Sequence, residues 1–192
     1  MRDGETVTGD GDDAIPGFVL TRGSDRYGRC VALAGRGDPP AASGEATYVD
    51  VELLTHTANH HLIATGLAYP TFYLKLWPDL RGELAARSLA ARPASGVWAE
   101  DRTLTGVTVT GLDGLSDDAV ILPKLFRRLA DYLALNGGDP SLAGLPAYLA
   151  QRDDRVLILS TGHYTGFDFV VAVDGQSVRL TRPHEDLVFQ EA

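Results

Sequence analysis

The sequence predicts an α+β protein, and three observations lead to this fold class. Residues 17–34 show two short strands around a polar turn. Residues 50–96 hold two helical patterns, each with an aspartate at its start and a glycine at its end. Beyond residue 101, strand and helix signals are interspersed and end in an Asp-Gly hairpin. We therefore expect helices and strands in separate segments of the chain.

The first segment, residues 1–15, carries five acids and three glycines, and we expect a flexible lead-in. Residues 17–21 predict a strand, residues 22–28 a turn, and residues 30–34 the returning strand. Cys30 opens that returning strand, and we expect a small buried hydrophobe there. A single cysteine excludes a disulfide within the chain.

Two helices follow. Asp50 caps a helix that we expect to reach about Thr65, where Gly66 ends it. Its predicted apolar face consists of Leu54, Ala58, His61 and Leu62. Asp79 caps the next helix, which Pro93 and Gly96 close, and we expect Trp98 to fold back onto the protein.

The composition changes after Asp101. The expected elements are a short strand, two helices, a buried strand and a hairpin, at residues 107–109, 123–136, 141–151, 155–160 and 167–181. We expect residues 102–192 to form an α+β appendage of ordinary domain size.

Four landmarks stand in one order along the chain. They are Asp25-Arg26-Tyr27-Gly28-Arg29, Asn59, Gly66-Leu67-Ala68 and Gly96-Val97-Trp98-Ala99-Glu100-Asp101. In this order they resemble the second half of a staphylococcal-nuclease-like (thermonuclease) domain over about residues 18–101. The resemblance implies a partial OB-fold-like β-barrel with two helices. It divides the chain into a lead-in at 1–15, an incomplete nuclease-like domain at 16–101 and an extension at 102–192.

The resemblance also implies roles for residues. Arg29 matches the family's catalytic arginine, which contacts the phosphate in the transition state through a guanidinium fork. Arg26 and Tyr27 are expected beside the substrate, and Asn59 is expected to support the fold. The alternative for Arg29 is a salt bridge that merely closes the turn.

The family's first half brings the calcium carboxylates and the glutamate that activates water. Residues 3–7 only imitate one of those motifs, and Asp174 and Glu185 are better explained by a hairpin and a polar tail. We therefore expect no metal ligands in this chain, although calcium is the cofactor of a complete family member. Little or no hydrolysis should follow. The missing strands should also leave an exposed sheet edge and allow self-association.

The histidines suggest a second kind of site. Glu52, His56 and His60 are spaced four residues apart and share one stripe of the predicted helix, which is a spacing that can hold a transition metal. The stripe lies opposite the predicted apolar face, so a solvated surface is the favoured interpretation. His61 is expected to pack.

The net charge of −9 limits the function. Tight, metal-independent binding of nucleic acid usually needs a basic surface, so we expect weak binding at most. No apolar run is long enough for a membrane span, and we expect a cytoplasmic protein without a membrane partner. The sequence leaves two functions open: a nuclease with DNA or RNA as substrate, and a non-catalytic module that binds a protein or a nucleic acid.

Overall fold

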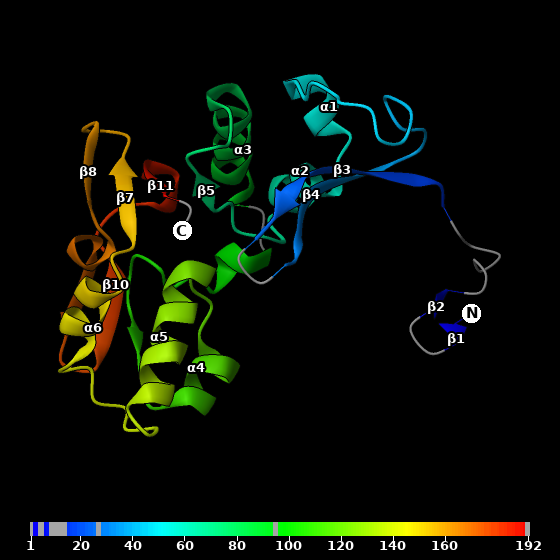
Figure 1. Cartoon of the computed structure of the whole chain (residues 1–192). Coiled ribbons are helices and arrows are strands. Elements are labelled where there is room, and N and C mark those ends of the chain that lie inside the picture. Colours follow the sequence, from blue (N-terminus) through cyan, green and yellow to red (C-terminus); the bar gives the residue numbers. More distant parts are fainter. Residues whose placement is uncertain (1, 4–5, 8–14, 26–27, 94–95, 191–192) are drawn as a thin grey trace. The chain divides into compact units, whose positions relative to one another are not determined.

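The structure is a computed structural model that describes residues 2–3, 6–7, 15–25, 28–93 and 96–190 (Figure 1). It is mixed α+β, as predicted, and its strands form small open sheets. The chain divides into two compact units, Met1–His61 and Leu62–Ala192. The sequence predicts a different boundary, between residues 101 and 102, where the nuclease-like segment should end. That boundary stays a prediction.

A long hairpin dominates the first unit (Figure 1). Strand β3 (Gly17–Ser24) pairs antiparallel with β4 (Cys30–Arg36), with a bulge between Thr21 and Gly23. Near the N-terminus, β1 (Arg2–Asp3) pairs antiparallel with β2 (Thr6–Val7). The prediction that Cys30 is buried is wrong: Cys30 is exposed, because it pairs with Ser24 at the turn end of a two-stranded sheet.

The hairpin contains a close side-chain approach that requires a glycine. A Cβ atom at Gly35 would lie 2.1 Å from Cζ of Phe18, its cross-strand partner. The Phe18 ring thus covers the backbone of Gly35. Any larger residue at position 35 would displace this ring, so Gly35 is set by packing.

One predicted helix is two helices in the structure. Asp50 caps α1 (Val51–Thr55) as expected, since its Oδ1 accepts from the Leu53 N–H at 2.8 Å. The chain then breaks, and α2 (Ala58–Ala64) begins at a second cap, Thr57. The Thr57 Oγ1 accepts from the His60 N–H at 3.2 Å, which is the N-cap geometry.

The break changes which residues are buried. Leu54, Thr57, His60 and Ile63 are buried, while Leu62 is 42% exposed and Ala58 and His61 are exposed. The predicted apolar face is therefore wrong beyond Leu54. The break at Thr57 interrupts the helical repeat, so the buried side of α2 does not continue that of α1.

The second unit opens with β5 (Phe72–Tyr73) and α3 (Pro78–Ala91), followed by the short 3-10 helix η1 (Gly96–Ala99). Helix α3 begins at Pro78 with Trp77 at the N-cap, so Asp79 lies in the first turn and is not the cap. A first-turn proline lacks only an N–H that would be unpaired in any case, and a first-turn aspartate suits the helix dipole.

Two sheets complete this unit. The first has the order β6-β10-β9, from β6 (Val107–Thr108), β9 (Val171–Asp174) and β10 (Ser177–Leu180). The second has the order β5-β11-β7-β8, from β7 (Arg155–Ile158), β8 (His163–Gly166) and β11 (Leu187–Phe189). Only the β5–β11 pairing is parallel. Residues 72–73 and 187–189 therefore share one sheet.

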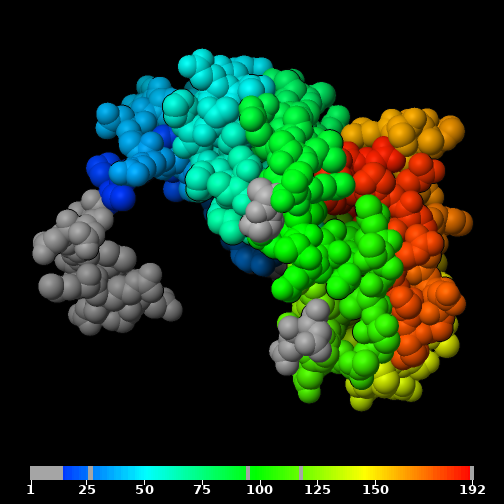
Figure 2. Space-filling model, turned by 180° about the vertical axis from the view of Figure 1, so that it is seen from behind, coloured from blue at the N-terminus to red at the C-terminus, as the bar shows by residue number. Residues whose placement is uncertain are grey.

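Three helices cover the core of this unit. Helix α5 (Pro123–Leu135) packs against α4 (Leu112–Asp118) and α6 (Leu145–Gln151). The fully buried apolar side chains of this unit include Leu122, Leu125, Leu129, Leu133, Leu142, Val156, Phe167 and Leu187. Seen from behind, the orange and red residues of β9–β11 lie beside green residues of the same unit (Figure 2).

Candidate functional site

Arg29 lies at the tip of the β3–β4 hairpin. The turn is closed by two backbone hydrogen bonds, from the Asp25 N–H to the Arg29 carbonyl and from the Gly28 N–H to the Asp25 carbonyl, both 2.9 Å. Gly28 has a φ of 77°, which most other residues adopt only with strain. An aspartate at the start and a glycine near the end thus fix where Arg29 leaves the turn.

The Arg29 guanidinium is held by Asp25. Arg29 Nε donates to Asp25 Oδ2 at 2.7 Å, and the second guanidinium nitrogen lies 2.6 Å from the same oxygen. Asp25 Oδ1 also accepts from the Arg29 N–H at 3.0 Å. The Arg29 side chain is 69% exposed, so the ion pair is screened by water and contributes at most about 1 kcal/mol. A phosphate approaching from solvent can compete for such a group.

The other two expected site residues, Arg26 and Tyr27, lie outside the described residues. Their placement beside a substrate therefore stays a prediction.

The hairpin is basic, although the whole chain is acidic. Residues 15–37 contain four arginines, Arg22, Arg26, Arg29 and Arg36, against the one acid Asp25, a net charge of +3. The chain as a whole carries −9. An excess of positive charge in one segment of the chain favours contact with phosphates.

Asn59 anchors the hairpin to α2, in agreement with its expected structural role. Its Oδ1 accepts from the Ala34 N–H at 3.0 Å, and its Nδ2 donates to the Ala32 carbonyl at 3.4 Å. Both bonds reach the outer edge of β4. The asparagine amide thus replaces a neighbouring strand along two residues of that edge.

The two glycine landmarks meet in the second unit. The Val97 N–H donates to the Gly66 carbonyl at 2.8 Å, and a Cβ atom at Gly96 would lie 2.1 Å from that oxygen. Both glycines have positive φ, 72° and 70°. The two glycines that the sequence predicts at helix ends are therefore in direct backbone contact.

The histidine stripe does not form in the structure. His56 and Glu52 are exposed, whereas His60 is 8% exposed, because the helix breaks between His56 and Ala58. The expectation of a fully solvated stripe is wrong for His60, and the expectation that His61 packs is wrong as well. Within the described residues, no group of three or more His, Cys, Asp or Glu side chains could hold a metal ion.

The aromatic residues near the family landmarks pack within the second unit. Phe72 is 1% exposed, and the Tyr73 ring lies 6.2 Å from that of Phe189. Trp98 folds back as predicted and stacks on His184, with ring centroids 5.2 Å apart. Tyr69 donates to Asp101 Oδ1 at 2.7 Å, and burial together with this bond raises its pKa.

A second polar group joins α3 to the short 3-10 helix η3 (His184–Asp186). Arg92 donates to both oxygens of Glu185 at 2.7 Å, and Ser88 Oγ donates to Glu185 Oε1 at 3.0 Å. Burial alone would raise the pKa of Glu185. The hydrogen bond and charge of His184, with the charge of Arg92, outweigh burial and lower this pKa to about 2.

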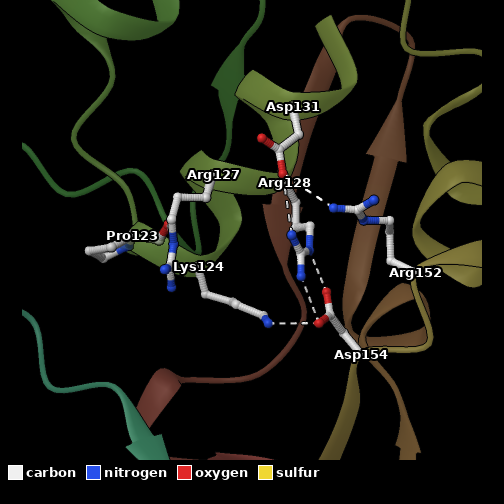
Figure 3. Close-up of polar contacts among 7 residues, drawn as sticks. All are labelled: Pro123, Lys124, Arg127, Arg128, Asp131, Arg152 and Asp154. Carbon is white, nitrogen blue, oxygen red and sulfur yellow. Dashed lines mark hydrogen bonds and ion pairs between the residues drawn. The ribbon is translucent and has the colours of Figure 1, made fainter. Parts of the chain in front are cut away.

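A third group is a buried charge cluster in the core of the second unit (Figure 3). Lys124 and Arg128 of α5 are 8% and 9% exposed and both contact Asp154. Lys124 Nζ lies 2.8 Å from Asp154 Oδ1. Burial raises the pKa of Asp154, but the hydrogen bonds from Arg128 and Lys124 outweigh it and lower the pKa.

This cluster could not be predicted from the sequence, since Arg127-Arg128 is a short basic pair and Asp154 lies 26 residues from Arg128. Burial of Lys124 lowers its pKa despite the partner. Asp154 pairs with both cations, so the cluster holds α5 against the start of β7.

Comparisons with known proteins were made by family, by sequence and by structure. No family model, no curated protein and no solved structure matches this chain. No helix among the described residues is long and apolar enough to cross a membrane.

Proposed function

We propose that this chain is related to the calcium-dependent thermonucleases and contacts nucleic-acid phosphates through Arg29, with weak or no hydrolysis of its own. The observation that carries the proposal is the hairpin tip. There an exposed guanidinium is oriented by Asp25 in a segment whose net charge is +3. Arg26 and Tyr27 would flank the same phosphate.

The other landmarks support this proposal as parts of a scaffold. In it, the β3–β4 hairpin and the helices α1–α3 are the remnant of an OB-fold-like barrel. Asn59 bonds to β4, and Gly66 meets Gly96 through the backbone. Each landmark therefore has a physical role beyond its place in the sequence order.

The described residues around Arg29 do not fit a calcium site. Asp25 contacts Arg29, and both of its carboxylate oxygens accept hydrogen bonds from that residue. Calcium takes six to eight oxygen ligands, usually with several carboxylates. We assign no step to calcium here, and weak activity is what this arrangement predicts for the chain alone.

The second candidate is a non-catalytic interaction module. It is favoured by the acidic charge outside the hairpin, which suits a protein partner better than a nucleic acid. In this case the hairpin would serve as a structural element and Arg29 only as the closure of its turn.

The direct test is cleavage of single-stranded DNA with added calcium, by wild type, Arg29→Ala and the matched control Arg36→Ala. Arg36 is exposed at the far end of β4 and leaves the turn untouched. We expect cleavage close to background. Any residual activity should fall by about 10²–10³ in Arg29→Ala and only slightly in Arg36→Ala, which removes a hairpin charge away from the turn. Robust turnover by wild type would contradict the proposed weak activity.

A further inference from the structure

The outer edge of β3 is the edge that faces away from β4. Among the described residues, β3 pairs only with β4. The outer edge of β4 is different, because Asn59 forms hydrogen bonds with Ala32 and Ala34 there. Thr57 also lies opposite Gly35 along this edge, in an isolated antiparallel bridge. In the part of the chain that the structure describes, the hairpin therefore has one covered edge and one edge whose backbone groups have no strand partner.

The hydrogen bonds identify which groups β3 presents. Ala32 and Ala34 of β4 direct their backbone groups toward Asn59, so Leu33 and Gly35 direct theirs toward β3. Their partners on β3 are Leu20 and Phe18. By alternation, Gly17, Val19 and Thr21 point their N–H and C=O groups outward. The Pro16 carbonyl agrees with this phase, since it accepts from the Gly37 N–H at 2.8 Å.

The first part of this edge, residues 17–21, lacks the usual protection against pairing. The stretch Gly17–Thr21 contains no charge and no proline, and the Val19 side chain is 61% exposed. Charged residues, prolines or a covering segment normally prevent two edges from joining. The β3 bulge lies only after Thr21, so the stretch before it is a regular strand.

We propose that a second copy of this chain occupies the β3 edge, through antiparallel β3–β3 pairing centred on Val19. In this register each Val19 lies opposite the other Val19, and each Gly17 lies opposite a Thr21. All outward N–H and C=O groups of these three residues are then paired. A two-fold contact uses the same groups on both sides, which is the commonest symmetry of homodimers. This inference is independent of the proposed function.

The charge of the hairpin sets how this dimer responds to salt. Two copies, each with +3 on residues 15–37, repel one another, so added salt should strengthen the pairing. Binding of nucleic acid weakens with salt instead. Salt therefore has opposite effects on dimerisation and on nucleic-acid binding. Either one can be measured even if the other does not occur.

The test is sedimentation of the full chain over a concentration series at low and high salt. We expect the mass to rise from 20.5 kDa toward twice that value, more steeply at high salt. Val19→Lys places a charge at the centre of the pairing and should weaken dimerisation at least tenfold. The matched control is Val31→Lys on β4, which is 52% exposed and adds the same charge away from the edge. It should dimerise as wild type does.

Hydrogen exchange on the wild type gives a second readout that needs no variant. The amides of Val19 and Thr21 should become protected as the concentration rises, while those of Phe18 and Leu20 keep the protection that β4 gives them. A chain that stays monomeric at every concentration overturns the proposal. So does a dimer that Val19→Lys leaves intact, or one in which Val19 and Thr21 gain no protection.

Discussion

At the scale of single residues, Arg29 shows how one geometry serves two roles. The salt bridge to Asp25 closes the turn, and it also sets the direction of the guanidinium. An exposed ion pair of this kind stabilises the fold little. The two interpretations of Arg29 differ in whether its guanidinium binds a phosphate. They predict the same stability, so binding has to be measured.

Glu185 should make the stability of the second unit depend on pH. Its pKa in the folded state, about 2, lies below the ordinary value of 4.5, so the unfolded chain binds the proton more readily. The contribution is fully present above about pH 4.5 and is lost as the pH falls toward 2. Its size is on the order of 3 kcal/mol, from 1.36 kcal/mol per pKa unit.

Urea unfolding at several pH values measures this contribution. Glu185→Gln should be less stable than wild type at pH 6, and the difference should shrink as the pH falls through this window. Glu52→Gln, at an exposed position of α1, is the control and should follow wild type. A constant difference between Glu185→Gln and wild type from pH 6 to 2 would show that Glu185 does not titrate in this way.

Asp154 should be the most sensitive polar residue of the core. Asp154→Asn removes the anion that both Lys124 and Arg128 contact, and leaves two buried cations beside one another. We expect a loss of about 3–5 kcal/mol in the free energy of unfolding. The neighbouring Asp153→Asn is a matched control, since Asp153 is exposed and its φ of 49° suits asparagine. Equal stability of the two variants would contradict this assignment.

At the scale of elements, the Gly66–Gly96 contact joins the end of α2 to the start of η1. Gly96→Ala should destabilise the protein by more than about 1 kcal/mol, because its Cβ would lie 2.1 Å from the Gly66 oxygen and its φ is 70°. Gly82→Ala in α3 has open space around it and should be neutral or stabilising. Thermal unfolding compares them, and a neutral Gly96→Ala would mean that the contact is not maintained.

The β3–β4 hairpin, helices α3 and α5 and strands β6, β7, β9 and β10 were predictable from the sequence, whereas α4, β5, β8 and β11 were not. Two helices have other bounds than predicted, for local reasons. Periodicity spans residues 50–65, but Thr57 is a better helix cap than an interior residue and splits the helix. Helix α6 begins at Leu145 and not at Ser141. There Asp139 Oδ1 accepts from the Ser141 N–H and holds a turn, and Pro146 fits the first turn of the helix.

The candidate site was predictable only in part. Arg29 stands out because the turn around it has a sequence signature, and Asn59 because of its place before a helix stop. The partners Glu185 and Asp154 could not be predicted, since they lie 93 residues from Arg92 and 26 residues from Arg128. Such pairings depend on tertiary packing, which the local pattern does not contain.

At the scale of the whole molecule, charge is unevenly distributed along the chain. The net charge of residues 15–37 is +3, whereas that of the whole chain is −9. The acidic remainder should repel nucleic acid, and the hairpin should attract it only at short range, within a Debye length of about 10 Å at 0.1 M salt. Weak and strongly salt-dependent binding is the expected result.

The most direct measurement is binding of labelled single-stranded DNA by wild type, Arg29→Ala and Arg36→Ala, by gel shift and anisotropy at low ionic strength. We predict weak binding by wild type that added salt removes, a clear loss in Arg29→Ala, and a much smaller loss in Arg36→Ala, which removes one positive charge of the hairpin away from its tip. Circular dichroism checks that all three chains are folded. Absence of binding at the lowest salt, or equal binding by Arg29→Ala and wild type, would contradict phosphate contact by Arg29. The non-catalytic interaction module would then be the remaining candidate function.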